Sequence, residues 1–245
     1  MLDVLFLNAP YHGGFSRGQR SPAVIKSGTM YYPFWLAFAT GVAEEAGLAA
    51  KLLDAPAEGL DDEATLAEIR RLSPRLLVIE TSTPSIESDV TFARRAKEAA
   101  PCVVCLVGTH ATAEAKGILR SHPAIDAIAM GEYDYTTTEL ARALTAGKNW
   151  SDIPGLCCRR GVEIRRSPAR APIENLDALP FLSRVYKKHL DVDNYFFSIS
   201  RNPMVMLVSG RGCPRRCFFC VFPQTLHGSR FRCRSAEHAA EALAS

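Results

Sequence analysis

The sequence lacks a long hydrophobic run, a basic leader and a strong charge imbalance, and each absence excludes a class of protein. No segment approaches the roughly 18 consecutive apolar residues of a membrane-spanning helix, so we expect no membrane span. The first residues, Met1–Leu7, carry no basic segment and do not resemble a signal peptide. The 29 basic and 26 acidic residues leave a net charge of +3, too small to predict a nucleic-acid partner.

The sequence also lacks solenoid repeats and low-complexity runs, whereas 47% of its residues are hydrophobic, which is enough to bury a core. Charge is uneven along the chain. From Arg201 onward there are seven arginines but only two acids, Glu237 and Glu241. This excess suits a cofactor with carboxylate or phosphate groups, and the alternative is an ordinary solvated surface.

Short apolar runs alternate with helical patterns over the first 147 residues. Continuous apolar strands separated by helices predict a parallel sheet covered on both faces, in a doubly wound α/β domain of flavodoxin or Rossmann type. The predicted strands are Val4–Leu7, Leu52–Leu53, Leu76–Ile79, Cys102–Val107 and Ile125–Met130. The predicted helices are Pro33–Ala46, 61–72, Ser85–Ala99, Ala111–Ser121 and Thr136–Ala146.

The rest of the chain predicts two further units. Residues 1–150 form the α/β domain, 151–200 a connector with a small hairpin at Gly155–Arg166, and 201–245 a third part. That third part has a predicted strand at Met204–Val208, a cysteine loop and the start of a helix at Ser235. These pieces cannot bury their apolar faces alone, so we expect the chain to be truncated or to need a partner segment.

Eight cysteines without a secretion signal indicate a reducing compartment, so we expect a cytoplasmic protein with cysteines that bind metal rather than form disulfides. Cys213, Cys217 and Cys220 lie within eight residues on the loop after a predicted strand. Thiolates hold clusters of iron and sulfide, and three of them would leave one iron of a cubane open. The alternative is a zinc site with Cys233 as fourth ligand, which the spacing fits poorly.

The C-x-x-x-C-x-x-C spacing, with the lead-in Gly210–Pro214, resembles the radical S-adenosylmethionine enzymes. The resemblance implies that Cys213, Cys217 and Cys220 bind a [4Fe–4S] cluster whose open iron chelates S-adenosylmethionine. It also implies that the third part opens a (β/α) barrel and that the cofactor is cleaved to a 5′-deoxyadenosyl radical.

The first 150 residues resemble the cobalamin-binding domain that precedes this barrel in one large subfamily. The resemblance is carried by the order of short motifs along the chain: Leu5–Pro10, Tyr32-Pro33, Leu53–Ala55, Gly108–Ala111, Gly131-Glu132 and the connector Pro172–Pro180. It implies cobalamin as a third cofactor. The D-x-H-x-x-G motif is absent, so the resemblance implies that no histidine from that motif ligates cobalt.

We expect cobalamin at the carboxyl ends of the strands, where ligands of such sheets bind. Glycine allows close approach of backbone to a corrin, and small polar side chains can bond its amides. The candidate cofactor-binding residues are Thr81, Ser82, Thr83, Gly108, Thr109, His110, Gly131 and Glu132.

The resemblance favours a cobalamin-dependent methyltransferase acting on an unactivated carbon of a small-molecule substrate, with an electron donor such as flavodoxin or ferredoxin. Two alternatives remain. Cyclases and rearrangement enzymes share the architecture, and a flavodoxin-like binding module with a zinc-binding tail would carry out no radical chemistry.

Overall fold

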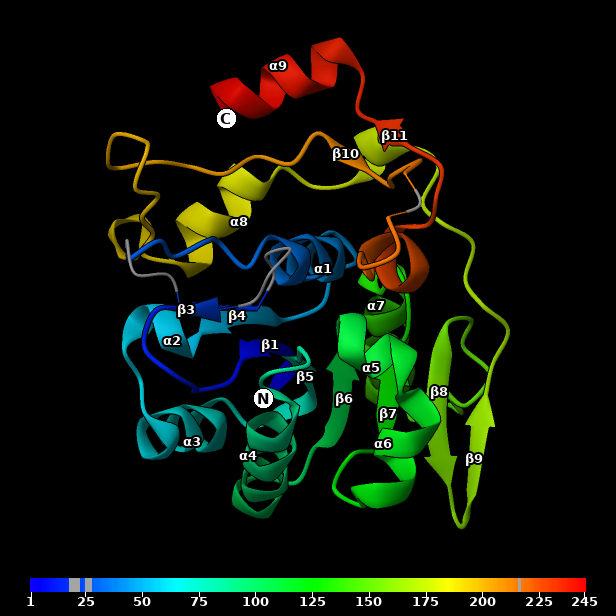
Figure 1. The fold of residues 1–245 in the computed structure, drawn as a ribbon. Coiled ribbons are helices and arrows are strands. Elements are labelled where there is room, and N and C mark those ends of the chain that lie inside the picture. The colour runs from blue at the N-terminus through cyan, green and yellow to red at the C-terminus, as the bar shows by residue number, and fades with distance from the viewer. Residues whose placement is uncertain (18–22, 25–27, 216) are drawn as a thin grey trace.

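The structure is a computed structural model, and it describes residues 1–17, 23–24, 28–215 and 217–245. Its centre is a seven-stranded sheet with the strand order β4-β1-β5-β6-β7-β8-β9 (Figure 1). These strands are β1 (Leu2–Asn8), β4 (Ala50–Asp54), β5 (Pro74–Glu80), β6 (Val103–Val107), β7 (Ala127–Ala129), β8 (Leu156–Arg160) and β9 (Glu163–Arg166). The first five are parallel in the flavodoxin-like order, so the predicted doubly wound fold is confirmed.

Strand alternation divides the core into two layers. Val4 and Phe6 of β1 belong to the cluster under helices α1 and α7, whereas Leu5 and Leu7 belong to the opposite cluster. The first face is covered by α1 (Phe34–Glu45) and α7 (Asp134–Thr145), with α8 (Leu182–His189) packed outside α1. The second is covered by α3 (Asp62–Leu72), α4 (Ile86–Ala99) and α6 (Ala115–Ser121).

Three elements differ from the sequence-based prediction. The helix expected at Ala111–Ser121 is two helices, α5 (Thr109–Ala113) and α6, because Glu114 between them leaves helical dihedrals. The hairpin expected in the connector is β8–β9, and it extends the main sheet by pairing antiparallel with β7. The strand predicted at Met204–Val208 is wrong, because the described residues provide no neighbouring strand to pair with it.

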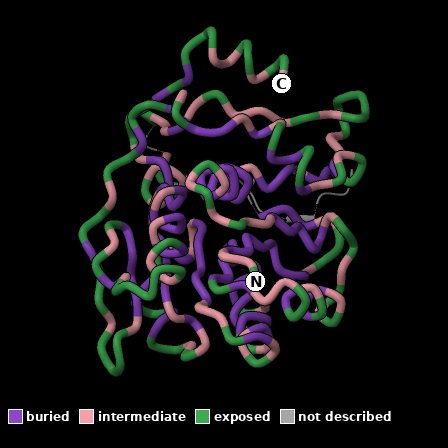
Figure 2. Tube along the Cα trace, turned by 180° about the vertical axis from the view of Figure 1, so that it is seen from behind, coloured by how far each residue is buried: buried purple, intermediate pink, exposed green. Residues whose placement is uncertain are grey.

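Residues after the connector lie across α1 and the carboxyl ends of β6 and β7 (Figure 1). Their elements are β10 (Gly210–Arg211), the π-helical segment η3 (Pro223–His227), β11 (Arg232–Cys233) and α9 (Ala236–Ala244). The other short elements are β2 (Phe15–Ser16), β3 (Ala23–Val24), α2 (Ala55–Glu58), η1 (Leu176–Ala178) and η2 (Val192–Asn194). In contrast to the central sheet, α9 buries none of its residues (Figure 2).

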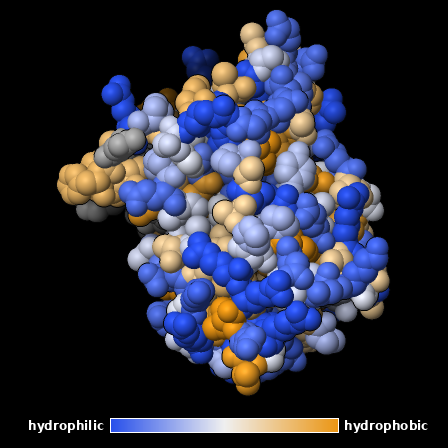
Figure 3. All heavy atoms as spheres, turned by 90° about the vertical axis from the view of Figure 1, so that its right-hand side faces the viewer, coloured by the Kyte–Doolittle hydropathy of each residue, from blue (hydrophilic) through white to orange (hydrophobic). Residues whose placement is uncertain are grey.

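The surface is mainly hydrophilic on the side that carries β8 and β9, with apolar side chains gathered in a few places (Figure 3). The most exposed aromatic side chains lie in the cysteine loop, where Phe218 and Phe219 are 94% and 67% exposed. Within the described residues, every helix is too short or too polar to cross a bilayer.

Candidate cofactor site

Three polar side chains end neighbouring strands at the carboxyl edge of the sheet, and all three are buried. Asn8 ends β1, Asp54 ends β4 and Glu80 ends β5. The Asn8 amide donates to Asp54 across 3.2 Å, and the hydroxyl of Tyr195 donates to the other Asp54 oxygen across 3.0 Å. This edge is where doubly wound sheets bind their ligands.

Several buried polar atoms near this edge make no hydrogen bond to any described residue. They are Asn8 Oδ1, Arg17 Nη1, Glu80 Oε2, Thr81 Oγ1 and Tyr133 Oη. Buried polar atoms are nearly always paired with protein, water or ligand. A ligand rich in amides and hydroxyls, such as the side chains and tail of a corrin, offers partners of the right chemistry.

Burial sets the protonation of the two carboxyl groups. It raises the pKa of Glu80 to about 8, and only the partial opposition of nearby Arg17 limits the rise. Burial likewise raises the pKa of Asp54 to about 6, against the hydrogen bonds from Tyr195 and Asn8. At neutral pH Glu80 therefore keeps its proton and can donate a hydrogen bond as well as accept one.

The predicted segments 81–83 and 108–110 lie side by side. The amide of Thr81 donates to Val107 across 2.9 Å, which continues the contact between β5 and β6. Ser82 is buried and pairs with Ser85 at 2.9 Å. Thr83 lies at the surface, where its hydroxyl is 3.2 Å from Nδ1 of His110. The structure thus brings these residues together, and their contact with a cofactor stays a prediction.

Gly108 lies against another backbone segment of this chain, and its contact with a corrin stays a prediction. Its φ is +108°, and a Cβ placed on it would meet the Thr81 carbonyl oxygen at 2.4 Å. This close approach between two backbone segments requires glycine at position 108. By contrast, Gly131, with φ of +71°, has open space where a side chain would lie.

Glu132 anchors the loop after β7. Its carboxylate accepts from the Ile173 amide at 2.7 Å and from both Nη atoms of Arg232 at 3.0 and 2.5 Å. Burial alone would raise its pKa, but nearby His227 and these donors outweigh burial and lower the pKa to about 2. Both carboxylate oxygens of Glu132 thus have hydrogen-bond donors within the chain.

Cys213, Cys217 and Cys220 line one cavity of about 520 Å³. Trp35 of α1, Arg211 and His227 line it as well, so the cavity lies between the cysteine loop and the α/β domain. Cys233 is exposed in β11 and does not line it. Among the described residues, no three side chains of metal-binding type converge as a formed metal site. Three half-exposed thiols around one cavity are nonetheless the donor set that an iron–sulfur cluster requires.

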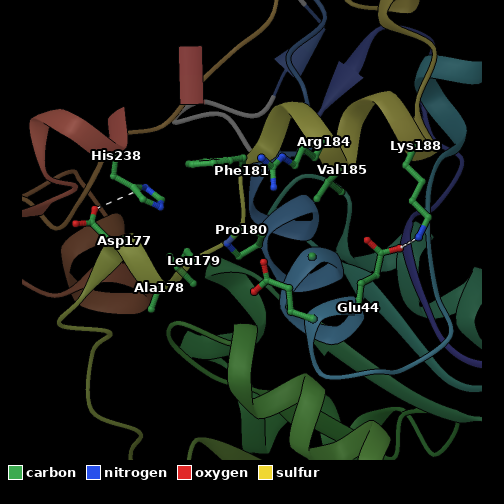
Figure 4. A pocket seen from close by; sticks show the side chains of 12 residues that line it. Glu44, Asp177, Ala178, Leu179, Pro180, Phe181, Arg184, Val185, Lys188 and His238 are labelled. Carbon is green, nitrogen blue, oxygen red and sulfur yellow. Dashed lines mark hydrogen bonds and ion pairs between the residues drawn. The ribbon is translucent and has the colours of Figure 1, made fainter. Parts of the chain in front are cut away.

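A second cavity, of about 390 Å³, lies between α1, α8 and the connector (Figure 4). Two pairs of its charged side chains contact each other: Asp177 lies 3.7 Å from His238, and Lys188 donates to Glu44 at 2.5 Å. None of the candidate cofactor residues lines it, so the site is assigned to the sheet edge and the cysteine cavity.

Sequence reasoning included Asn8 in the motif Leu5–Pro10 but not among the candidate contacts, and it missed Arg17 and Glu80. The available signal was a polar residue directly after an apolar run, as in Leu7-Asn8 and Ile79-Glu80. Arg17 gave no such signal. It reaches Asp89 at 2.6 Å only because the loop after β1 folds back over the sheet edge.

Comparison with known proteins shows which families and proteins this chain is similar to. Residues 20–141 match the B12 binding domain family. An uncharacterized methyltransferase of Pyrococcus horikoshii is 32% identical over 218 residues, which is 88% of this chain and 46% of that protein. The anaerobic magnesium-protoporphyrin IX monomethyl ester cyclase of Rubrivivax gelatinosus is 27% identical over 231 residues, which is 89% of this chain and 38% of the cyclase. The chain therefore spans less than half the length of these relatives.

Solved structures share the fold at low sequence identity. The radical S-adenosylmethionine methyltransferase TsrM of Kitasatospora setae, solved with cobalamin and a [4Fe–4S] cluster, has a TM-score of 0.68 and 18% identity; the match covers 99% of this chain and 45% of TsrM. OxsB, a cobalamin-dependent S-adenosylmethionine radical enzyme, has a TM-score of 0.69 and 14% identity; the match covers 98% of this chain and 31% of OxsB.

Proposed function

This chain belongs to the B12 binding domain family, and we propose that it is part of a cobalamin-dependent radical S-adenosylmethionine enzyme that methylates an unactivated carbon. The chain spans less than half of its curated relatives, so the proposal concerns the whole enzyme. In it, this chain supplies the cobalamin-binding domain and the loop of three cysteines.

One observation carries the proposal: the three cysteines line a single cavity whose far wall belongs to the B12-binding domain. Cys213, Cys217 and Cys220 share that cavity with Trp35, which lies within the B12-binding match, whereas Cys233 is outside it. This arrangement supports a cluster beside cobalamin rather than a four-cysteine zinc site.

The residues present suit both cofactors. Three thiols offer the cluster its protein ligands, and the unpaired buried atoms at the sheet edge offer the corrin its polar partners. When bound, the cluster supplies the electron that cleaves S-adenosylmethionine, and cobalamin supplies methyl-transfer chemistry. The chain itself provides a cavity with Arg215 on its wall, and the positive charge of this side chain favours a carboxylate.

The test is anaerobic reconstitution of the chain with iron and sulfide, followed by gel filtration with cobalamin. We expect a brown protein with absorbance near ~400 nm and retained cobalamin for this chain, and 5′-deoxyadenosine on reduction with S-adenosylmethionine for the whole enzyme. Replacing Cys213, Cys217 or Cys220 by Ala should abolish cluster loading, and Cys233→Ala is the matched control. Colourless protein with stoichiometric zinc, lost equally in Cys233→Ala, would establish the zinc-bearing module instead.

A cyclase is the second candidate, and a specific observation favours it. Two relatives of this chain, 27% and 26% identical, are anaerobic magnesium-protoporphyrin IX monomethyl ester cyclases. The two reactions separate by their products: a methyltransferase yields S-adenosylhomocysteine together with 5′-deoxyadenosine, whereas a cyclase yields no S-adenosylhomocysteine. In either case we propose a small-molecule substrate, a flavodoxin or ferredoxin as electron donor, and a cytoplasmic setting.

A further inference from the structure

Two buried arginines of the cysteine segment are each held by a carboxylate of the loop after β7. Arg211 in β10 donates from Nη1 and Nη2 to Asp134, the first residue of α7, at 2.7 and 2.9 Å. Arg232 in β11 donates to both oxygens of Glu132 at 3.0 and 2.5 Å. The four side chains are at most 5% exposed, so both pairs are shielded from water and salt.

The two arginines are partners in one small sheet. Arg211 lies opposite Arg232 in the antiparallel pair β10–β11. The guanidinium of Arg211 also lies 4.6 Å from the ring centre of Phe38 in α1, a cation–π contact. Arg232 further donates to the carbonyl oxygen of His227 at 2.8 Å, which ties η3 to the same point. A two-stranded sheet that is marginal alone is thereby fastened to the α/β domain.

Such pairs fix geometry more than they add stability. Desolvation offsets most of the attraction in a buried ion pair, but a bidentate guanidinium–carboxylate pair permits a single orientation. Removing one partner leaves an unpaired buried charge, which the surrounding structure must move to hydrate. The pairs are therefore suited to setting the position of the segment that carries them.

The position of the segment that carries Arg211 and Arg232 affects both predicted cofactor sites. Arg211 is two residues before Cys213, whose amide is itself held by the carbonyl of Gly228 at 3.2 Å. Glu132 directly follows Gly131 in the loop predicted to contact cobalamin, and Asp134 begins α7 two residues after Glu132. One set of contacts thus joins the base of the cysteine loop to the loop predicted to contact cobalamin.

We propose that Arg211–Asp134 and Arg232–Glu132 form an interdomain clamp of positioning residues. The clamp fixes the cysteine loop against the carboxyl edge of the sheet and makes the binding of one cofactor strengthen the binding of the other. The coupling between cofactors rests on the proposed function, whereas the fixing of the loop does not.

Whether the clamp holds the cysteine loop in place is tested without any cofactor, by the rate at which a thiol reagent labels the three loop cysteines. Asp134→Asn keeps the shape of the side chain and removes its charge, and Arg211→Lys keeps the charge but cannot form the two-pronged contact. We expect both variants to label several-fold faster than the parent chain. Lys97→Gln is the control. Lys97 donates to both oxygens of Asp126 at 2.5 and 2.6 Å, and Asp126 directly precedes β7, at the edge of the sheet opposite to the clamp. Unchanged labelling in both variants would overturn the clamp.

The coupling is tested by the dissociation constant of cobalamin, measured for the cluster-loaded and the cluster-free chain. We expect the parent chain to bind at least about fivefold tighter when loaded. We expect this ratio to fall to about one in Asp134→Asn and to persist in Lys97→Gln. If both cofactors bind but the parent ratio is one, or Asp134→Asn retains it, the coupling is refuted and the proposed function stands. If neither cofactor binds, the proposed function fails and the coupling with it, while the labelling result still decides the clamp.

Discussion

Adding one methyl group at Gly108 is expected to damage the whole domain, because this glycine lies where two backbone segments nearly touch. Gly108 has φ of +108° and ψ of −177°, a region open almost only to glycine. A Cβ there would lie 2.4 Å from the carbonyl oxygen of Thr81. Since that oxygen belongs to backbone, it can withdraw only if the end of β5 shifts.

Three costs contribute to the expected loss of stability in Gly108→Ala. The unfavourable dihedrals cost about 1–3 kcal/mol, and overpacking against Thr81 costs about 1–3 kcal/mol. Displacing Thr81 also weakens the 2.9 Å bond from its amide to Val107, worth about 1 kcal/mol. The free energy of unfolding should therefore fall by about 3–7 kcal/mol, a large part of the roughly 5–15 kcal/mol of a typical domain.

Urea unfolding followed by far-UV circular dichroism measures this change, and Gly131→Ala is the matched control. Gly131 also has positive φ, at +71°, but no atom lies within 4 Å of the position of its Cβ. The control should therefore lose only about 1–2 kcal/mol. If Gly108→Ala lost no more than Gly131→Ala, the close approach of Thr81 would be refuted. If the larger loss is found, failure of a bulky Gly108 variant to bind cobalamin would report unfolding and not corrin contact.

The remaining predictions concern buried titratable groups. Burial raises the pKa of Glu80 to about 8 from its ordinary 4.5, so the folded chain holds a proton that the unfolded chain releases. The free energy of unfolding should therefore fall as pH rises between these values, by up to about 1.4 kcal/mol per pH unit. Glu80→Gln should flatten that slope in urea titrations at pH 5, 6, 7 and 8. Tyr195→Phe leaves a buried oxygen of Asp54 without its 3.0 Å donor and should cost about 1–3 kcal/mol, with an unchanged unfolding midpoint as the contrary result. Burial raises the pKa of the Cys105 thiol to about 12, so iodoacetamide at pH 8 should label exposed Cys233 and leave Cys105 unlabelled until the chain unfolds; mass spectrometry of the labelled peptides decides this.

The α/β domain followed from the sequence because its signals are local. Each strand is a short apolar run such as Leu76–Ile79, and burial of both faces of a parallel sheet requires that composition. The helices between the strands carry their own signals, as where Asp61 accepts from the Ala64 amide to begin α3. The sequence predicted the cysteine trio as a metal site for the same reason, because its three thiols lie within eight positions of the chain.

Elements that depend on a distant partner were predicted poorly. Residues Met204–Val208 have the composition of a strand, but a strand needs a neighbour to accept its backbone hydrogen bonds, and no described segment takes that place. The β8–β9 hairpin was recognised from its turn, but its pairing with β7 came from long-range contact and not from its own pattern.

The candidate site also combines residues with a local sequence signal and contacts that only long-range folding creates. The sequence predicted Gly108 and Glu132 as cobalamin contacts but could not indicate their partners within the chain, because those partners lie far along the sequence. Gly108 is constrained by Thr81, 27 residues earlier, and Glu132 is held by Arg232, 100 residues later. Residue type, spacing and the order of short motifs therefore predicted which cofactors the chain would bind. Only the tertiary structure decided which charged side chains form buried pairs within the fold, because burial and pairing arise only when distant segments meet.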